Sequence, residues 1–80
     1  MILKILLFGV TRDIVGGSNL DIQIPDGQNV GGMMKELKTL YPEFSKLKSL
    51  LVAVNNDYAD EDMVLTQNDE IALIPPVSGG

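Results

Sequence analysis

The apolar residues of this chain fall into short runs separated by turn residues. Residues 1–8 form a nearly continuous apolar run that is broken only by Lys4. A short run that is apolar on both faces is typical of a central strand whose sheet is covered on both sides. Residues 20–24 instead alternate between apolar and polar side chains. This alternation predicts a half-buried strand that ends at the turn residues 25–27.

A helical period replaces the alternation between residues 30 and 41. Apolar side chains recur there at spacings of four, three and four residues, which predicts a helix with one buried face. Asn29 is a suitable N-cap, and Pro42 limits the other end of the helix. The pair Gly31–Gly32 weakens the first turn by about 1 kcal/mol per glycine, so we expect a frayed start.

The second half of the chain contains further apolar runs. Residues 44–50 predict a short irregular or helical link, and residues 51–54 predict a third strand. Residues 63–65 predict a short fourth strand, and residues 70–74 predict the last one. The two prolines that follow end this strand, because proline has no N–H to contribute to a ladder of hydrogen bonds.

This order of elements predicts an α+β fold of the β-grasp type, with one mixed sheet packed on one main helix. Residues 1–74 are expected to form this domain, and residues 75–80 are expected to form an extended, flexible C-terminal tail. No internal repeat or linker interrupts the pattern.

Composition narrows the chemistry available to this domain. The chain has no cysteine and no histidine, which removes disulfides, the usual zinc ligands and the commonest general base at neutral pH. Its serines have no histidine to activate them. The formal net charge is −5, and the six Lys and Arg residues are scattered among eleven acidic ones. Nucleic acid and anionic membranes are therefore poor partners, whereas a basic protein surface is a suitable one.

Other charged and apolar segments favour structural interpretations. An acidic group near the third strand has no spacing typical of a metal site, so we expect a solvated loop at Asp57, Asp60, Glu61 and Asp62. Arg12 is expected to lie on the surface or to fix the loop after the first strand. The first apolar run is too short for a signal peptide or a membrane span, so we expect a cytoplasmic protein.

The C-terminal residues carry the strongest functional signal. Two prolines stiffen the exit from the domain, and the small residues Val77, Ser78, Gly79 and Gly80 follow. Six extended residues span up to about 20–22 Å, which is long enough to place the terminal carboxylate inside another protein's active site. An end without side chains fits a narrow channel. Adenylation would make this carboxylate an acyl donor, and sulfide attack would then give a thiocarboxylate.

Residues 65–80 resemble the small subunits of molybdopterin synthase, the MoaD-like proteins, most specifically in the Asp69–Glu70 turn and the Pro-Pro-Val-Ser-Gly-Gly ending. The similarity continues in residues 52–55 and in the first strand followed by Arg12, so it covers essentially the whole chain. Asn68 stands where the family usually carries glycine, and a left-handed backbone there would explain both residues.

The resemblance implies a ubiquitin-like β-grasp sulfur carrier that is itself a non-catalytic subunit of a sulfurtransferase. In this family an ATP-dependent, E1-like enzyme adenylates the C-terminal glycine, which then becomes a thiocarboxylate. Gly80 would carry the sulfur, and Gly79 would let the end fit the large subunit of molybdopterin synthase. Sulfur would pass there to cyclic pyranopterin monophosphate in molybdenum cofactor biosynthesis, within a heterotetramer. No bound cofactor or metal is implied, only the acyl-adenylate and the thiocarboxylate as transient forms.

A docking surface for the large subunit is expected beside the tail. Lys4 indicates that one face of the first strand is open to solvent, and Phe8 would lie on that face. Ile74 would join Phe8 if the last strand lies beside the first, with Tyr58 at the edge of the patch. The tail residues that would follow into the partner are Pro75, Pro76, Val77 and Ser78. The alternative is that loops cover these apolar residues as ordinary core.

Three other functions remain compatible with the sequence. A sulfur carrier for thiazole formation in thiamin synthesis is the nearest, although such carriers usually lack the two prolines. A ubiquitin-like modifier would form an isopeptide bond from Gly80 to lysines of other proteins. A plain β-grasp interaction module would leave its tail idle.

Overall fold

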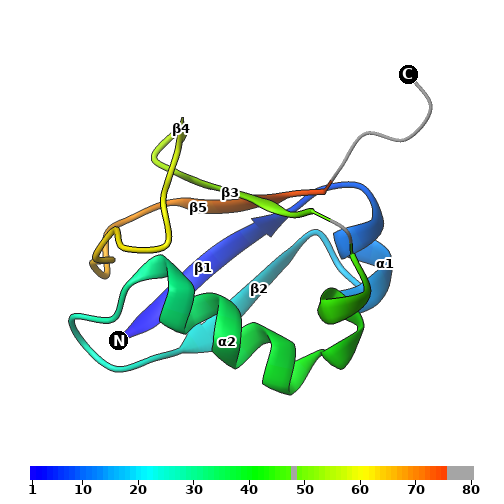
Figure 1. Cartoon of the computed structure of the whole chain (residues 1–80), viewed down its shortest axis with the longest axis horizontal. Coiled ribbons are helices and arrows are strands. Elements are labelled where there is room, and N and C mark those ends of the chain that lie inside the picture. Colours follow the sequence, from blue (N-terminus) through cyan, green and yellow to red (C-terminus); the bar gives the residue numbers. More distant parts are fainter. Residues whose placement is uncertain (48, 76–80) are drawn as a thin grey trace.

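The computed structural model describes residues 1–47 and 49–75, and it has the predicted β-grasp arrangement of one mixed sheet on one main helix (Figure 1). The sheet order is β2-β1-β5-β3-β4, with β1 parallel to β5 and the other neighbours antiparallel. No helix among the described residues is long and apolar enough to cross a membrane. The elements are β1 (Ile2–Leu7), α1 (Val10–Val15), β2 (Asn19–Gln23), α2 (Val30–Leu40), the 3-10 helix η1 (Pro42–Lys46), β3 (Leu51–Val54), β4 (Asp57–Tyr58) and β5 (Ile71–Ile74).

The hydrophobic core lies between α2 and one face of the sheet. Alternate residues of β1 and β5 are fully buried there, and Met33 and Leu37 of α2 pack in the same core. The expectation that both faces of β1 are covered is wrong, because Ile2 is 59% exposed and Lys4 is also exposed. The described chain has one main helical layer, so the opposite face of the sheet stays open to solvent.

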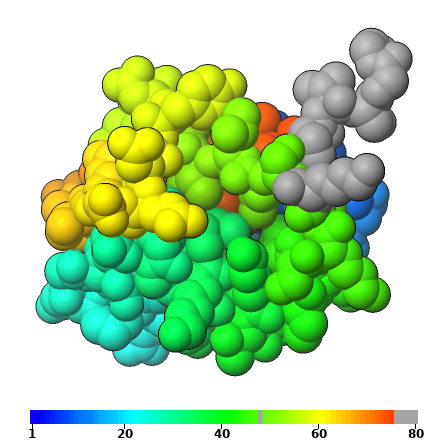
Figure 2. Space-filling model, viewed as in Figure 1, coloured from blue at the N-terminus to red at the C-terminus, as the bar shows by residue number. Residues whose placement is uncertain are grey.

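The start of α2 is well fixed, contrary to the frayed first turn expected from its glycines. The Asn29 side chain caps the helix by accepting a hydrogen bond from the Gly32 N–H at 2.8 Å, as predicted. The Gly31 N–H donates to the Glu61 carbonyl at 2.9 Å. Figure 2 shows the segment around residue 61, in yellow, lying against the start of α2. The Gln28 carboxamide occupies the space that a Cβ of Gly32 would fill, so glycine permits a close approach here.

The fourth strand is not where the sequence placed it. Residues 63–65 form no strand, and Val64 makes only an isolated bridge to Asn29. The chain returns earlier, at β4, because Asn55 (φ 53°) and Asn56 (φ 72°) form a two-residue hairpin turn with positive φ at both positions. Asparagine tolerates this conformation well, and it matches the twist of antiparallel strands.

The expected left-handed backbone at Asn68 is also wrong. Among the described residues other than glycine, only Asn55 and Asn56 have positive φ. The turn before β5 is closed instead by Asp69, whose N–H donates to the Thr66 carbonyl and whose carboxylate accepts from the Thr66 N–H at 2.8 Å. A side chain therefore fixes this turn without positive φ at Asn68.

Candidate functional site

One row of residues crosses the open face of the sheet from β1 to β4. The pairing register joins Leu6 to Ala72, Ala72 to Ala53, and Ala53 to Tyr58. These four residues come from four different strands, yet they lie on the same face because paired residues point to the same side. With strands about 4.8 Å apart, the row from Leu6 to Tyr58 is about 14 Å long.

A second row lies next to the first, toward the end of β5. Leu51 pairs with Ile74, and Phe8 stands two residues beyond Leu6 and therefore on the same face. Phe8 is 41% exposed, Leu51 50% and Tyr58 71%, so this apolar surface is open to a partner. We call it the open-face patch, and it consists of Leu6, Phe8, Leu51, Tyr58, Ala72 and Ile74.

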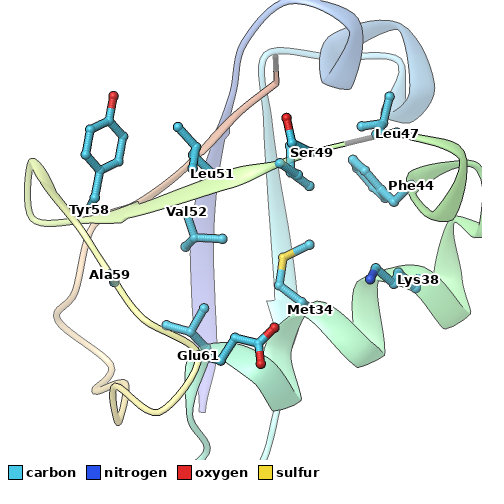
Figure 3. A pocket seen from close by; sticks show the side chains of 12 residues that line it. Met34, Lys38, Phe44, Leu47, Ser49, Leu51, Val52, Tyr58, Ala59 and Glu61 are labelled. Carbon is cyan, nitrogen blue, oxygen red and sulfur yellow. The ribbon is translucent and has the colours of Figure 1, made fainter.

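The two faces of β3 and β4 differ clearly in the close view of Figure 3. The side chains of Leu51 and Tyr58 point away from α2, whereas Val52 and Met34 point toward one another between the sheet and the helix. Leu51 was not singled out from the sequence. All four residues of β3 are apolar, so the sequence contains no alternation from which its exposed face could be read.

A hydrogen-bonded corner between β1 and α1 fixes Phe8. The fully buried Thr11 hydroxyl donates to the Phe8 carbonyl at 2.6 Å and accepts from the Phe8 N–H at 2.9 Å. Arg12 Nε donates to the Leu7 carbonyl at 2.9 Å, and the guanidinium carbon lies 5.6 Å from the centre of the Phe8 ring. This distance is in the range of a cation–π contact. The expectation that Arg12 fixes the loop after the first strand is confirmed.

The last described residue, Pro75, rests on this corner. Gly9 has φ +57°, and a Cβ built on it would lie 2.9 Å from Cγ of Pro75. Because β1 and β5 are parallel, they end at the same side of the sheet, next to α1 (Figure 1). The chain therefore leaves β5 beside Phe8 and the open-face patch.

The structure brings together the predicted partner-binding residues that it describes. Leu7 pairs with Leu73, so Phe8 and Ile74 follow directly after this pair at the ends of β1 and β5. Tyr58 lies at the edge of the patch on β4, and Pro75 follows Ile74. Loops do not bury Phe8 or Tyr58 as ordinary core. The remaining predicted site residues lie outside the described residues: Pro76, Val77, Ser78, Gly79 and Gly80.

A shallow cavity lies between α2 and the β3–β4 edge of the sheet, and Leu51 and Tyr58 of the open-face patch are among its lining residues. Its volume is about 250 Å³, and Lys38 and Glu61 are its charged lining residues. In Figure 3, Lys38 lies on α2 and Glu61 lies on the segment that follows Ala59. No group of three or more acidic side chains among the described residues is placed to hold a metal ion.

The pKa of Asp69 is shifted by hydrogen bonds to its carboxylate. The Thr66 N–H and the Asn55 side-chain amide donate to its carboxylate, which lowers its pKa below the ordinary value. The Glu70 N–H in turn donates to Asn55 Oδ1 at 2.9 Å. This network ties the β3–β4 turn to the start of β5, at the end of β5 opposite Pro75, so its role is structural.

Comparison with known proteins identifies the family. The ThiS family model matches residues 5–80. The molybdopterin synthase sulfur carrier subunit of Dictyostelium discoideum is 42% identical over 96% of this chain and 94% of its own length. The human protein of the same description is 32% identical over 96% of this chain and 92% of its own length.

Solved structures agree with the fold. A putative molybdopterin converting factor subunit 1 from Pyrococcus furiosus superposes with a TM-score of 0.88 at 24% identity, over 96% of this chain and 99% of that one. A chain in a complex of subunits 1 and 2 of the molybdopterin-converting factor from Helicobacter pylori has a TM-score of 0.59 at 27% identity, with both chains fully covered. The resemblance inferred from the sequence is confirmed, and the chain belongs to the ThiS family, together with the molybdopterin synthase sulfur carrier subunits.

Proposed function

We propose that this chain is the sulfur carrier subunit of a molybdopterin synthase, with sulfur held as a thiocarboxylate on Gly80. One observation supports it most directly. An exposed apolar patch of the sheet lies beside the point where the chain leaves β5 for its Gly-Gly end. A carrier needs such an arrangement, because its domain must bind an enzyme while its end reaches that enzyme's reaction centre. The relatives named as sulfur carrier subunits support the choice of pathway.

The proposed chemistry takes place at the terminal carboxylate in two steps. An ATP-dependent, E1-like enzyme joins the Gly80 carboxylate to AMP and releases pyrophosphate. A sulfur nucleophile then attacks the acyl carbon, AMP leaves, and the thiocarboxylate remains. Transfer of that sulfur to cyclic pyranopterin monophosphate, with oxygen supplied by water, returns the carboxylate for another round. Gly79 would let the end enter a narrow site, because it has no side chain.

The catalytic groups for these steps would belong to the partners. The chain contains no histidine or cysteine to act as base or nucleophile, and the charged residues that line the cavity near α2 are Lys38 and Glu61. We therefore infer that the large synthase subunit supplies the groups that act on the substrate. The carrier would supply the sulfur, the docking surface and a C-terminal segment several residues long that reaches the partner's site.

The large subunit would dock on the open-face patch. The patch has aromatic residues at two of its borders, Phe8 and Tyr58, and aromatic side chains are enriched at interface cores. The net charge of −5 favours a partner surface that is basic around this apolar centre. We place the carrier and its partners in the cytoplasm, since a chain without cysteine is compatible with a reducing compartment.

The direct test is a reconstituted synthase reaction. The chain would be prepared with a C-terminal thiocarboxylate and mixed with a large subunit from the same source and cyclic pyranopterin monophosphate. Molybdopterin is expected from the thiocarboxylate form alone, and none from the carboxylate form or from a chain lacking Gly80. No product from a verified thiocarboxylate would contradict the proposal. Thiazole formation with the corresponding thiamin enzymes, or lysine-linked conjugates in a lysate, would then identify one of the alternative functions.

A further inference from the structure

The contact between Gly9 and Pro75 joins two parts of the chain that are far apart in sequence. The space beside the Gly9 Cα is filled by the Pro75 ring, so no β-carbon can be accommodated there without displacing the ring. The Gly9 backbone (φ 57°, ψ −134°) lies in a region that only glycine adopts readily. Two independent features therefore require glycine at this position.

The corner that carries Gly9 is fixed on both sides. Before Gly9, the Thr11 hydroxyl bonds both polar backbone groups of Phe8, and Arg12 holds the Leu7 carbonyl. After Gly9, the Arg12 N–H donates back to the Gly9 carbonyl at 3.1 Å. The surface on which Pro75 rests is thus a rigid part of the domain rather than a loose loop.

We propose that this corner positions the root of the C-terminal tail, with Gly9 setting the place of Pro75 and with Thr11 and Arg12 holding the corner. These are positioning residues, since none of them would touch the reacting sulfur. The value of the arrangement rests on the function proposed above, whereas the contact itself can be tested without it.

The corner would fix the position of the tail root relative to the docking surface. Phe8 and Gly9 are consecutive residues, so the surface that binds the partner and the point that holds the tail belong to the same corner. A displaced tail root would leave the docking patch intact but would misplace the terminal sulfur in the partner's site. Misplacement by about 1 Å can cost about 100-fold in rate, so the effect should fall on kcat rather than on KM.

The first test measures geometry alone. Because the chain has no cysteine, the changes Lys35→Cys and Ser78→Cys allow two spin labels to be attached and the distance distribution between them to be measured. Gly9→Ala is expected to shift or broaden this distribution. Gly16→Ala is the control for adding a Cβ at a glycine of positive φ, because Gly16 (φ 89°, ψ 27°) is in the left-handed region and has open space where its Cβ would lie. In a Pro75→Ala background, which lacks the ring, Gly9→Ala should have a smaller further effect, because only the backbone strain at residue 9 remains. An unchanged distribution in folded Gly9→Ala would overturn the proposal.

The second test measures transfer with thiocarboxylated carriers and the large subunit. Gly9→Ala is expected to lower kcat by about 10-fold or more with the KM for the carrier unchanged, while Gly16→Ala keeps both values. A raised KM with normal kcat would overturn the proposal, because it would assign Gly9 to docking. If Gly9→Ala does not fold, Pro75→Ala alone is expected to broaden the distribution and lower kcat. If the thiocarboxylated carrier without any substitution gives no product, the proposed function fails, and the spin-label result still decides whether the corner positions the tail.

Discussion

The hydroxyl of Thr11 forms two hydrogen bonds with one residue, accepting from the Phe8 N–H at 2.9 Å and donating to the Phe8 carbonyl at 2.6 Å. Thr11 is completely buried, so its hydroxyl needs partners within the protein, and the Phe8 backbone provides both. The buried Thr11 side chain therefore holds the backbone of Phe8, whose exposed aromatic ring belongs to the docking surface.

Thr11→Val is expected to destabilise the domain by about 1–3 kcal/mol, because the shape is kept while the Phe8 N–H loses its partner. Urea unfolding gives the free energy, and amide hydrogen exchange shows whether Phe8 loses protection. Thr11→Ser is the control: it keeps the hydroxyl and loses one methyl group, so the Phe8 amide should stay protected. Equal loss of protection in both variants would show that the hydroxyl does not hold Phe8.

Phe8→Ala is expected to weaken binding of the large subunit by about 2 kcal/mol, or about 30-fold in Kd, since aromatic residues in an interface core often contribute this much. Leu40→Ala provides the comparison, because Leu40 is more exposed (53% against 41%) but lies on α2, on the other side of the sheet. Titration calorimetry with the isolated large subunit measures both. A loss for Leu40→Ala with none for Phe8→Ala would move the docking surface to the helical side.

Asp69 makes the stability of the fold depend on pH. Its pKa is lowered in the folded chain, chiefly by the hydrogen bond from the Thr66 N–H and then by that from the Asn55 side chain. The stabilisation is therefore fully present above the ordinary value of 3.8 and is lost as the pH falls through the lower, folded value.

Asp69→Asn should remove this contribution to the acid sensitivity and lower stability at neutral pH by about 0.5–1.5 kcal/mol, because a charged acceptor is replaced by an amide. Thermal unfolding followed between pH 2 and 7 compares the two proteins. A difference between them that is the same at all pH values would contradict the assignment.

Gly31 and Gly32 are neighbours in α2 but are expected to respond differently to alanine. A Cβ at Gly31 would meet Glu61 at 3.4 Å, which is an ordinary contact, so the higher helix propensity of alanine should stabilise the domain by up to about 1 kcal/mol. A Cβ at Gly32 would displace the Gln28 carboxamide, which bonds the Asn29 N–H at 3.1 Å. Loss of this hydrogen bond offsets the gain in helix propensity, so Gly32→Ala should change the free energy of unfolding little. Chemical unfolding of the two variants tests the difference, and a larger gain at Gly32 would contradict it.

Several elements could be predicted because their signals are local. The helical period and the Asn29 cap gave the start of α2, and Pro42 gave its end, since both depend on neighbouring residues. The fourth strand was misplaced because apolar residues at 63–65 outweighed the Asn55–Asn56 pair, a hairpin signal that does not depend on hydrophobicity. The role of Gly31 and Gly32 could not be predicted. It depends on the loop at Glu61, which is distant in sequence, and on the direction in which the Gln28 side chain points.

The sequence by itself determined the β-grasp class, because periodicity and turn chemistry are readable along the chain. The resemblance of residues 65–80 indicated the family, and Lys4 indicated an open face of β1 although the apolar run around it favoured two covered faces. Only the tertiary structure decided that Leu6, Ala72, Ala53 and Tyr58 form one row, and that Pro75 rests on Gly9. Strand register and close approaches arise from pairing between segments that are distant in sequence. Because all four residues of β3 are apolar, the pattern of this strand does not reveal which residues it will pair with.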